Sequence, residues 1–260
     1  MVLIHEGSTS ASRWLRSLQG RQAPRLRLVC FPHAGGAASF FRSWVPLIPD
    51  DVELMAVRYP GREDRLLEAP AERMEELADP LADACAGLAG SPLVFFGHSM
   101  GAAVAFEVAA RMAGTTSGAI RPEALFVSGR SGPGATRPRG LAGASDEELV
   151  KDLVAMSSTN EQALANTELR ELLLPAVRAD YRLVENYAAA SEPVLDIPVF
   201  AYYGNEDDHV DEESVTAWSG VTRSTFATRS FPGGHFYLEH HTAPLVADLL
   251  ARLTPHRTTT

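Results

Sequence analysis

The sequence predicts an α/β protein with a mostly parallel central sheet and helices on both of its faces. Short, nearly continuous apolar runs alternate with longer amphipathic segments along the 260 residues. Such runs are typical of strands that are buried on both faces. With 45% hydrophobic and 22% charged residues, the composition is that of an ordinary globular protein, and the length suits one hydrophobic core. We therefore expect a single domain over residues 1–260.

Six segments have the apolar character of buried strands: Leu26–Phe31, Val52–Val57, Leu93–Phe96, Ala124–Ser128, Val199–Tyr203 and Thr225–Phe231. Helical patterns lie between and after them, over Phe40–Ile48, Ala71–Leu88, Gly101–Met112 and Thr242–Leu253. Proline has no amide hydrogen, so Pro80 is expected to kink or break the second helix. Strands and helices that alternate at this spacing favour a parallel sheet.

About seventy residues after the fourth strand contain no convincing strand. The first fifteen are rich in Gly, Pro and Arg, which indicates a loop. Ser145 and Glu148 form a capping-box pattern that predicts the start of a helix ending at Met156. A second helix is expected over Thr167–Tyr187. Together these segments predict a helical lid insertion, over about residues 130–190, at one end of the sheet.

The charge of the chain argues against a nucleic-acid partner. The formal net charge is −10, whereas nucleic-acid binders present a basic face. The distribution is uneven, because residues 1–67 hold nine arginines against six acidic residues while residues 68–260 have a net charge of −13. Only one of the 23 basic residues is a lysine, Lys151.

The two cysteines indicate a reducing compartment. Cys30 and Cys85 lie far apart in apolar surroundings, which fits small buried side chains and neither a redox pair nor a zinc site. The first 24 residues have no apolar run of the kind found in signal peptides. No stretch approaches the roughly 20 apolar residues of a membrane span. We expect a cytoplasmic protein with no membrane association and no bound metal.

The strongest functional signal is the segment Gly97–Gly101 (GHSMG), which follows the apolar strand Leu93–Phe96 and opens a helix. A serine at a sharp strand-to-helix turn is lifted out of the sheet, and glycines are needed where neighbouring side chains would collide. The helix N-terminus places N–H groups and a positive dipole end beside Ser99. Ser99 is therefore the predicted nucleophile.

A serine nucleophile needs a base, and the base needs an acid that orients it. On this kind of sheet the order along the chain is serine, acid, histidine, with each partner after a later strand. The turn GNEDDHV after the fifth predicted strand supplies the acid. Asp207 is favoured because it follows Gly204 by three residues, and Asp208 and Glu206 are the alternatives.

The base is expected after the sixth predicted strand, in the segment PGGHF, where two glycines leave His235 accessible. His240 or His241 is the alternative. His98 lies within the serine turn and His209 within the acidic turn, so neither is favoured as the base.

Two backbone amides are expected to stabilise the negative charge that develops on the substrate oxygen. One belongs to Met100, the residue after the nucleophile. The other is expected in the glycine-containing loop after the first strand, where Ala34 is the candidate. His33 is expected to shape that loop without a catalytic role.

Four segments together resemble the stand-alone type II thioesterases that accompany modular polyketide and nonribosomal peptide synthases. They are Phe31–Ser39 (FPHAGGAAS), Arg58–Arg65 (RYPGREDR), Gly97–Gly101 (GHSMG) and Gly233–Phe236 (GGHF). Many hydrolases share GxSxG, whereas the Arg58–Arg65 string beside FPHAGG is far more selective. Leu172–Tyr187 resembles the lid helix of that family, and Ser157–Asn166 matches it less well. The resemblance runs from about Leu26 to Leu253.

The resemblance implies an α/β-hydrolase fold and hydrolysis of stalled or wrongly primed acyl groups from the phosphopantetheine arm of acyl or peptidyl carrier proteins. It assigns the catalytic triad to Ser99, Asp207 and His235 and the oxyanion hole to Ala34 and Met100, with no cofactor. A general carboxylesterase, a fatty-acyl chain-terminating thioesterase and an inactive binding module are the alternatives.

The carrier protein is the expected partner, and the chain is expected to be a monomer. Carrier proteins are acidic, so a basic face would favour the encounter. The net positive charge of residues 1–67, with Arg130, Arg137 and Arg139, is the candidate for that face.

Overall fold

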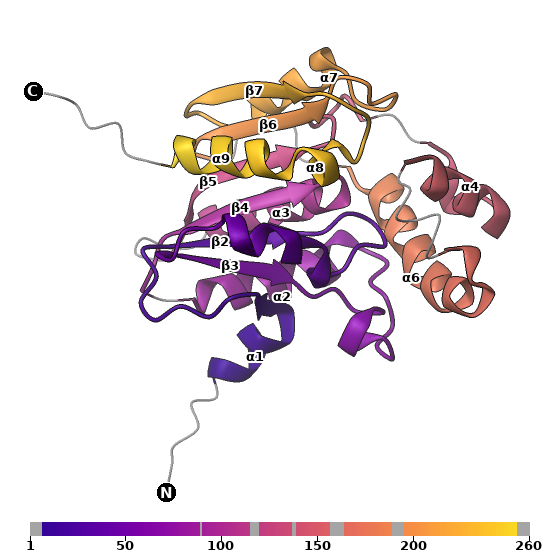
Figure 1. The fold of residues 1–260 in the computed structure, drawn as a ribbon, viewed down its shortest axis with the longest axis horizontal. Coiled ribbons are helices and arrows are strands. Elements are labelled where there is room, and N and C mark those ends of the chain that lie inside the picture. The colour runs from indigo at the N-terminus through magenta and orange to yellow at the C-terminus, as the bar shows by residue number, and fades with distance from the viewer. Residues whose placement is uncertain are drawn as a thin grey trace, which may run out of the picture.

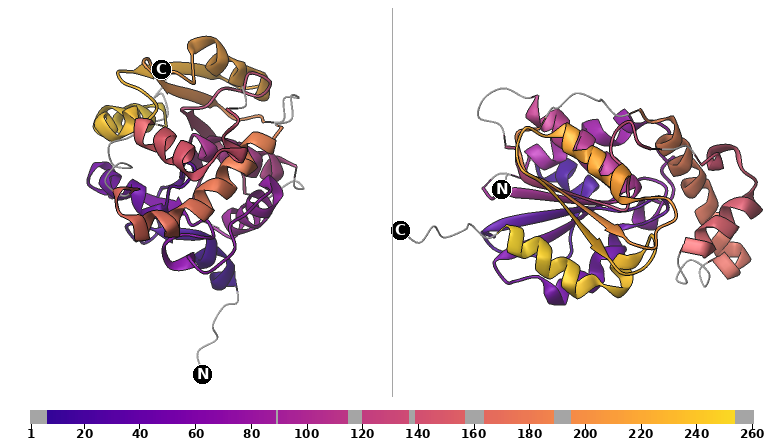
Figure 2. Two further views of the ribbon diagram at one scale, coloured as in Figure 1. Left: turned by 90° about the vertical axis from the view of Figure 1, so that its right-hand side faces the viewer. Right: turned by 90° about the horizontal axis from the view of Figure 1, so that it is seen from above.

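A computed structural model describes residues 7–88, 90–114, 120–136, 139–156, 164–188 and 195–253. A seven-stranded sheet lies at the centre with helices on both faces (Figures 1 and 2). The strands are β1 (Leu15–Ser17), β2 (Leu26–Phe31), β3 (Val52–Val57), β4 (Leu93–His98), β5 (Pro122–Ser128), β6 (Val199–Gly204) and β7 (Phe226–Phe231). Their order is β1-β3-β2-β4-β5-β6-β7, and only the pair β1 and β3 is antiparallel. The predicted, mostly parallel sheet is confirmed.

The α-helices are α1 (Gly7–Trp14), α2 (Met74–Ala86), α3 (Met100–Ala113), α4 (Asp146–Met156), α6 (Thr167–Asn186), α7 (Glu212–Thr216), α8 (Tyr237–His240) and α9 (Thr242–Arg252). The described residues also form the 3₁₀ segments η1 (Ala38–Leu47), η2 (Glu63–Arg65), η3 (Leu141–Gly143) and η4 (Ala217–Val221). In the described part of the chain, no helix is long and apolar enough to cross a lipid bilayer.

The apolar strands contribute side chains to two hydrophobic cores, one on each face of the sheet. In β2, Val29 and Phe31 point to the core that α2 and α3 cover, while Leu28 and Cys30 point to the core that η1 and α9 cover. Successive side chains of a strand point to opposite faces, so a strand between two helical layers needs apolar residues at every position. This explains the continuous apolar runs in the sequence.

The structure differs from two local predictions and adds one strand that the sequence analysis did not predict. Phe40–Ile48 does not form an α-helix but lies largely in the 3₁₀ segment η1, which contains Pro46. Helix α2 runs through Pro80 without a break, because the buried side chains around it hold the helix against the sheet. The edge strand β1 was not expected, since its three residues carry no recognisable pattern and form a strand by pairing with β3.

Helices α4 and α6, which we call the helical insertion, lie beyond one end of the sheet (Figure 1). They share a small apolar cluster of their own that includes Leu149, Leu153 and Val177. The predicted capping box is present, because the Ser145 amide donates to Glu148 and the Glu148 amide donates to Ser145 Oγ. Most of the weakly matching stretch 157–166 lies outside the described residues.

Candidate active site

Ser99 occupies a strained turn between β4 and α3. Its φ is +55° and its ψ is −116°, a conformation that costs a non-glycine residue about 1–3 kcal/mol. The Ser99 amide donates to the Ser128 carbonyl at 2.8 Å, which ties the turn to β5. A Cβ atom at Gly101 would lie 2.0 Å from the Phe31 carbonyl oxygen, and one at Gly97 would lie 2.2 Å from the Gly101 oxygen. Glycine is therefore required on both sides of the serine.

The predicted acid and base meet beyond the ends of β6 and β7. His235 Nδ1 lies 2.7 Å from Asp207 Oδ2, and the Asp207 side chain is 1% exposed. The other carboxylate oxygen of Asp207 accepts the His209 amide at 3.0 Å. Neither Glu206 nor Asp208 contacts His235 through a hydrogen bond in the described residues, so the structure favours Asp207 over both alternatives.

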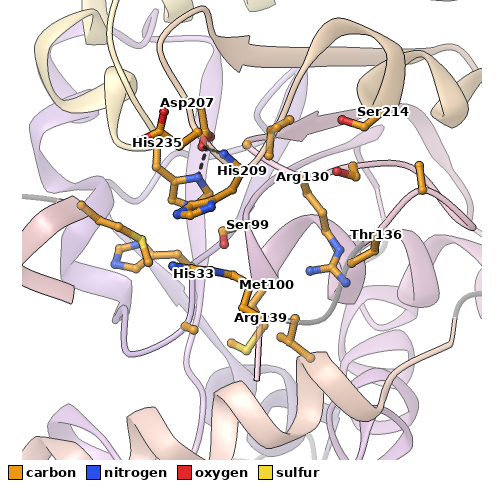
Figure 3. Close-up of a pocket in the computed structure, with 18 of the residues that line it drawn as sticks. His33, Ser99, Met100, Arg130, Thr136, Arg139, Asp207, His209, Ser214 and His235 are labelled. Carbon is orange, nitrogen blue, oxygen red and sulfur yellow. Dashed lines mark hydrogen bonds and ion pairs between the residues drawn. The ribbon is translucent and has the colours of Figure 1, made fainter. Parts of the chain in front are cut away.

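Figure 3 shows Ser99 below the imidazole of His235 and Asp207 above it, with a dashed line marking the hydrogen bond between Asp207 and the ring. The described residues give Ser99 Oγ no hydrogen-bond partner. Catalytic hydrogen bonds are often long in a free enzyme and tighten once substrate binds. The three predicted residues are thus brought to one place by three separate strand ends.

The state of Asp207 suits an orienting acid. Burial alone would raise its pKa, but the hydrogen bond and charge of His235 outweigh that effect and lower the pKa of Asp207 below its usual value. An ionised Asp207 accepts the Nδ1 proton of His235. That tautomer leaves the Nε2 atom of His235 free to take a proton from Ser99.

The loop after β2 is held against the helical insertion by a buried ion pair. Arg62 donates to both carboxylate oxygens of Asp180 on α6, at 2.7 and 2.8 Å, and both side chains are at least 95% buried. The amide of Gly35 donates to Asp180 at 2.7 Å, and Arg62 also donates to the Gly36 carbonyl at 3.1 Å. Ala34, the predicted oxyanion residue, therefore directly precedes an amide that is fixed by Asp180.

The motif Arg58–Arg65 drew attention to Arg62 in the sequence, but nothing there pointed to Asp180 as its partner. Asp180 lies within the segment that resembles a lid helix, 118 positions further along the chain. It is a functional candidate that sequence reasoning missed.

A second buried polar chain lies behind His235. His98 is fully buried and its Nδ1 lies 2.9 Å from Ser128 Oγ, which in turn lies 2.7 Å from the Tyr237 hydroxyl. The rings of His98 and His235 are 5.0 Å apart. Burial, with the nearby His235 and His33, lowers the pKa of His98 well below its usual value of 6.5. The imidazole of His98 is therefore neutral at physiological pH.

This burial predicts that stability falls with acid. Below about pH 6.5 the unfolded chain protonates His98, whereas the native state does not. The contribution of His98 to stability is therefore fully present above that pH. It should then decrease by up to about 1.4 kcal/mol per pH unit from this group alone. Urea unfolding at pH 7.5, 6.0 and 5.0 measures the decrease, and His98→Gln should reduce it; the rest of the slope comes from other buried groups such as His33, whose pKa burial lowers to about 3. Equal pH slopes for the two proteins would contradict the assignment.

A cavity of about 750 Å³ opens over Ser99. Both predicted oxyanion residues, Ala34 and Met100, line it beside the serine. Side chains from the helical insertion line it too, including Tyr181 within α6, as does Tyr187 directly after that helix. The cavity thus joins the reacting groups to the insertion.

The predicted basic docking face needs correction. Arg130 is not on the surface but 9% exposed and lines this cavity. It lies just after Gly129, the residue that follows β5, at the end of the strand beside the site. Arg139 forms an ion pair with Asp152, which neutralises its charge. Arg137 lies outside the described residues. Several arginines of the basic N-terminal region are also paired, among them Arg25 with Asp51.

Comparison with known proteins decides the family. The family model described as a thioesterase domain matches residues 26–253. The chain belongs to the thioesterase family. It is a hydrolase acting on thioesters, and the resemblance and α/β-hydrolase fold inferred from the four motifs are confirmed.

Two curated relatives and two solved structures illustrate the match. The thioesterase is 39% identical to Thioesterase PikA5 of Streptomyces venezuelae over 86% of its own length and 80% of the relative. It is 36% identical to a probable cadicidin biosynthesis thioesterase of Streptomyces griseus, over 95% and 68% of the two chains. The type II thioesterase BorB of the borrelidin cluster superposes with a TM-score of 0.84 at 38% identity, covering 93% and 98%. YbtT, a type II thioesterase of the yersiniabactin pathway, gives 0.82 at 28%, covering 92% and 97%.

Proposed function

We propose that this thioesterase removes stalled or aberrant acyl groups from the phosphopantetheine arm of carrier proteins in polyketide or nonribosomal peptide biosynthesis. The observation that carries the proposal is the Asp207–His235 hydrogen bond of 2.7 Å beside Ser99, at the floor of a cavity of about 750 Å³. The named relatives belong to such biosynthetic pathways, which favours editing over a general carboxylesterase or a chain-terminating thioesterase.

The geometry supports a two-step mechanism. His235 takes the proton of Ser99 as its oxygen attacks the thioester carbonyl, and Asp207 stabilises the imidazolium that forms. The tetrahedral intermediate collapses, the C–S bond breaks and the thiol leaves with the proton from His235. Water, deprotonated by His235, then attacks the acyl-enzyme. Collapse of this second intermediate releases the acid and returns the proton to Ser99.

The amides of Ala34 and Met100 are proposed to hold the carbonyl oxygen as it becomes negative. Loss of one such donor costs other serine hydrolases about 10²–10³ in rate. Since the adjacent Gly35 amide is anchored by Asp180, the position of the Ala34 amide depends on the helical insertion.

Carrier domains, a monomeric state and a cytoplasmic location remain predictions for this chain. Because Arg130 is buried and Arg139 is paired with Asp152, neither offers a carrier domain an unpaired surface charge.

The deciding experiment compares hydrolysis of a propionyl-carrier protein with that of a matched simple oxygen ester. We expect a preference of at least tenfold in kcat/KM for the carrier-bound thioester. Comparable or faster turnover of the oxygen ester would replace the editing assignment with a general esterase. Long-chain acyl groups preferred over propionyl would instead indicate a chain-terminating role.

A further inference from the structure

Arg130 is a buried cation that has no acidic partner in the described part of the chain. The other two buried arginines, Arg62 and Arg65, are paired with Asp180 and Glu68. No described residue accepts a hydrogen bond from the Arg130 guanidinium, and the aromatic ring of Tyr187 lies 6.0 Å away. Burial accordingly lowers the pKa of Arg130 to about 10. Burial of a guanidinium without an acidic partner costs free energy that an ion pair would offset.

The backbone of Arg130 is held rigidly next to the reacting groups. Its carbonyl accepts the indole N–H of Trp218 at 2.8 Å, and the amide of Gly129 donates to the Tyr202 carbonyl at 2.9 Å. A Cβ atom at Gly129 would lie 3.3 Å from His235 Cε1. Arg130 thus directly follows a residue whose backbone lies beside the predicted base.

Figure 3 shows the Arg130 side chain directed into the cavity, on the side of Ser99 away from His33. A charged fork of N–H donors that extends from a held backbone into an open cavity is suited to bind an anionic oxygen group. A buried charge without an opposite charge beside it is typical of binding and catalytic sites. A buried arginine with a purely structural role pairs with a carboxylate, as Arg62 and Arg65 do.

We propose that Arg130 binds an anionic oxygen group of the substrate. This inference rests on the proposed thioesterase function and adds a determinant of substrate choice to it. Two parts of a carrier-bound substrate can supply such a group. One is a carboxylate on the acyl chain, and the other is the phosphate of the phosphopantetheine arm.

Three small thioesters separate these sources: propionyl-pantetheine, propionyl-4′-phosphopantetheine and malonyl-pantetheine. For Arg130→Gln we expect kcat/KM to fall about 10- to 100-fold more on one charged substrate than on neutral propionyl-pantetheine. A selective loss on the malonyl thioester assigns the acyl carboxylate, and a selective loss on the phosphorylated substrate assigns the arm. Equal loss, or no loss, on all three would overturn the inference.

Two further variants separate binding from structure. Arg139→Gln removes a cation that lines the same cavity but is paired with Asp152, so its effect should be equal across the three substrates. Arg130→Lys should retain part of the selectivity, because it keeps the charge without the fork of donors. Arg130→Gln should leave the melting temperature unchanged or raise it, whereas a structural role predicts that it falls.

Failure of the proposed function can be distinguished from failure of the Arg130 inference. Wild-type protein that hydrolyses neither these thioesters nor the propionyl-carrier protein would refute the proposed editing function. The Arg130 inference would then be decided by titrating the Ser99→Ala protein with phosphopantetheine and malonyl-pantetheine. At least tenfold weaker binding of one of them by the Ser99→Ala, Arg130→Gln double variant would support it, and equal affinities would overturn it.

Discussion

Replacing Ser99 by alanine is expected to lower the kcat for thioester hydrolysis by roughly 10⁴-fold or more. The change removes the oxygen predicted to form the acyl-enzyme, while the Asp207–His235 pair keeps its contacts. Alanine must still adopt the positive φ of 55° at this turn, so the fold should survive. Steady-state hydrolysis of an acyl-pantetheine and labelling by a serine-directed phosphonate both measure the effect.

Ser43→Ala is the matched control, because Ser43 is an exposed serine on η1. It should retain full activity and leave phosphonate labelling intact. If Ser99→Ala keeps more than a tenth of the wild-type rate, the nucleophile lies elsewhere and the triad assignment fails.

Replacing Asp180 by alanine is expected to destabilise the protein by about 3–5 kcal/mol and to lower kcat. The stability loss follows because Arg62, 5% exposed, would remain buried without its partner. The loss in kcat follows because the Gly35 amide loses its acceptor and the neighbouring Ala34 amide is no longer positioned. Urea unfolding and steady-state kinetics measure the two effects separately.

A double variant separates the two roles of Asp180. Arg62→Met with Asp180→Leu replaces the ion pair by apolar side chains of similar volume, which is often neutral or stabilising for buried pairs. Stability should therefore recover while kcat stays low. Recovery of both would mean that Asp180 acts on stability alone. Asp146→Asn is the control for an exposed ion pair. It removes the partner of Arg178, which lies on α6 like Asp180, and should lower stability by less than about 1 kcal/mol.

Much of this fold could be read from the sequence because buried parallel strands and glycine-flanked turns carry strong local signals. The turn around Ser99 is an example. A Cβ atom at either of its glycines would lie only 2.0 or 2.2 Å from a backbone oxygen, so no other residue fits there. The choice among Glu206, Asp207 and Asp208 could not be made with the same force. Three acidic residues in a row have similar local propensities, and only the path of the turn directs one of them to His235.

Two features lay beyond sequence reasoning because they depend on tertiary contacts. The Arg62–Asp180 pair joins a loop to a helix far along the chain, and no periodicity relates the two positions. Arg130 was counted with the surface charges, as most arginines are exposed, whereas its place just after β5 carries it into the cavity. Net charge summed over a segment cannot distinguish a buried guanidinium from a solvated one.

The location of the one lysine has a practical consequence. Lys151 is exposed on α4, within the helical insertion, and it supplies the only side-chain amine of the chain. Amine-reactive dyes therefore label the insertion without any engineered cysteine, apart from the α-amino group at the terminus. A fluorophore placed there, paired with a quencher delivered to Ser99 as a phosphonate, would follow the distance between the insertion and the nucleophile in solution.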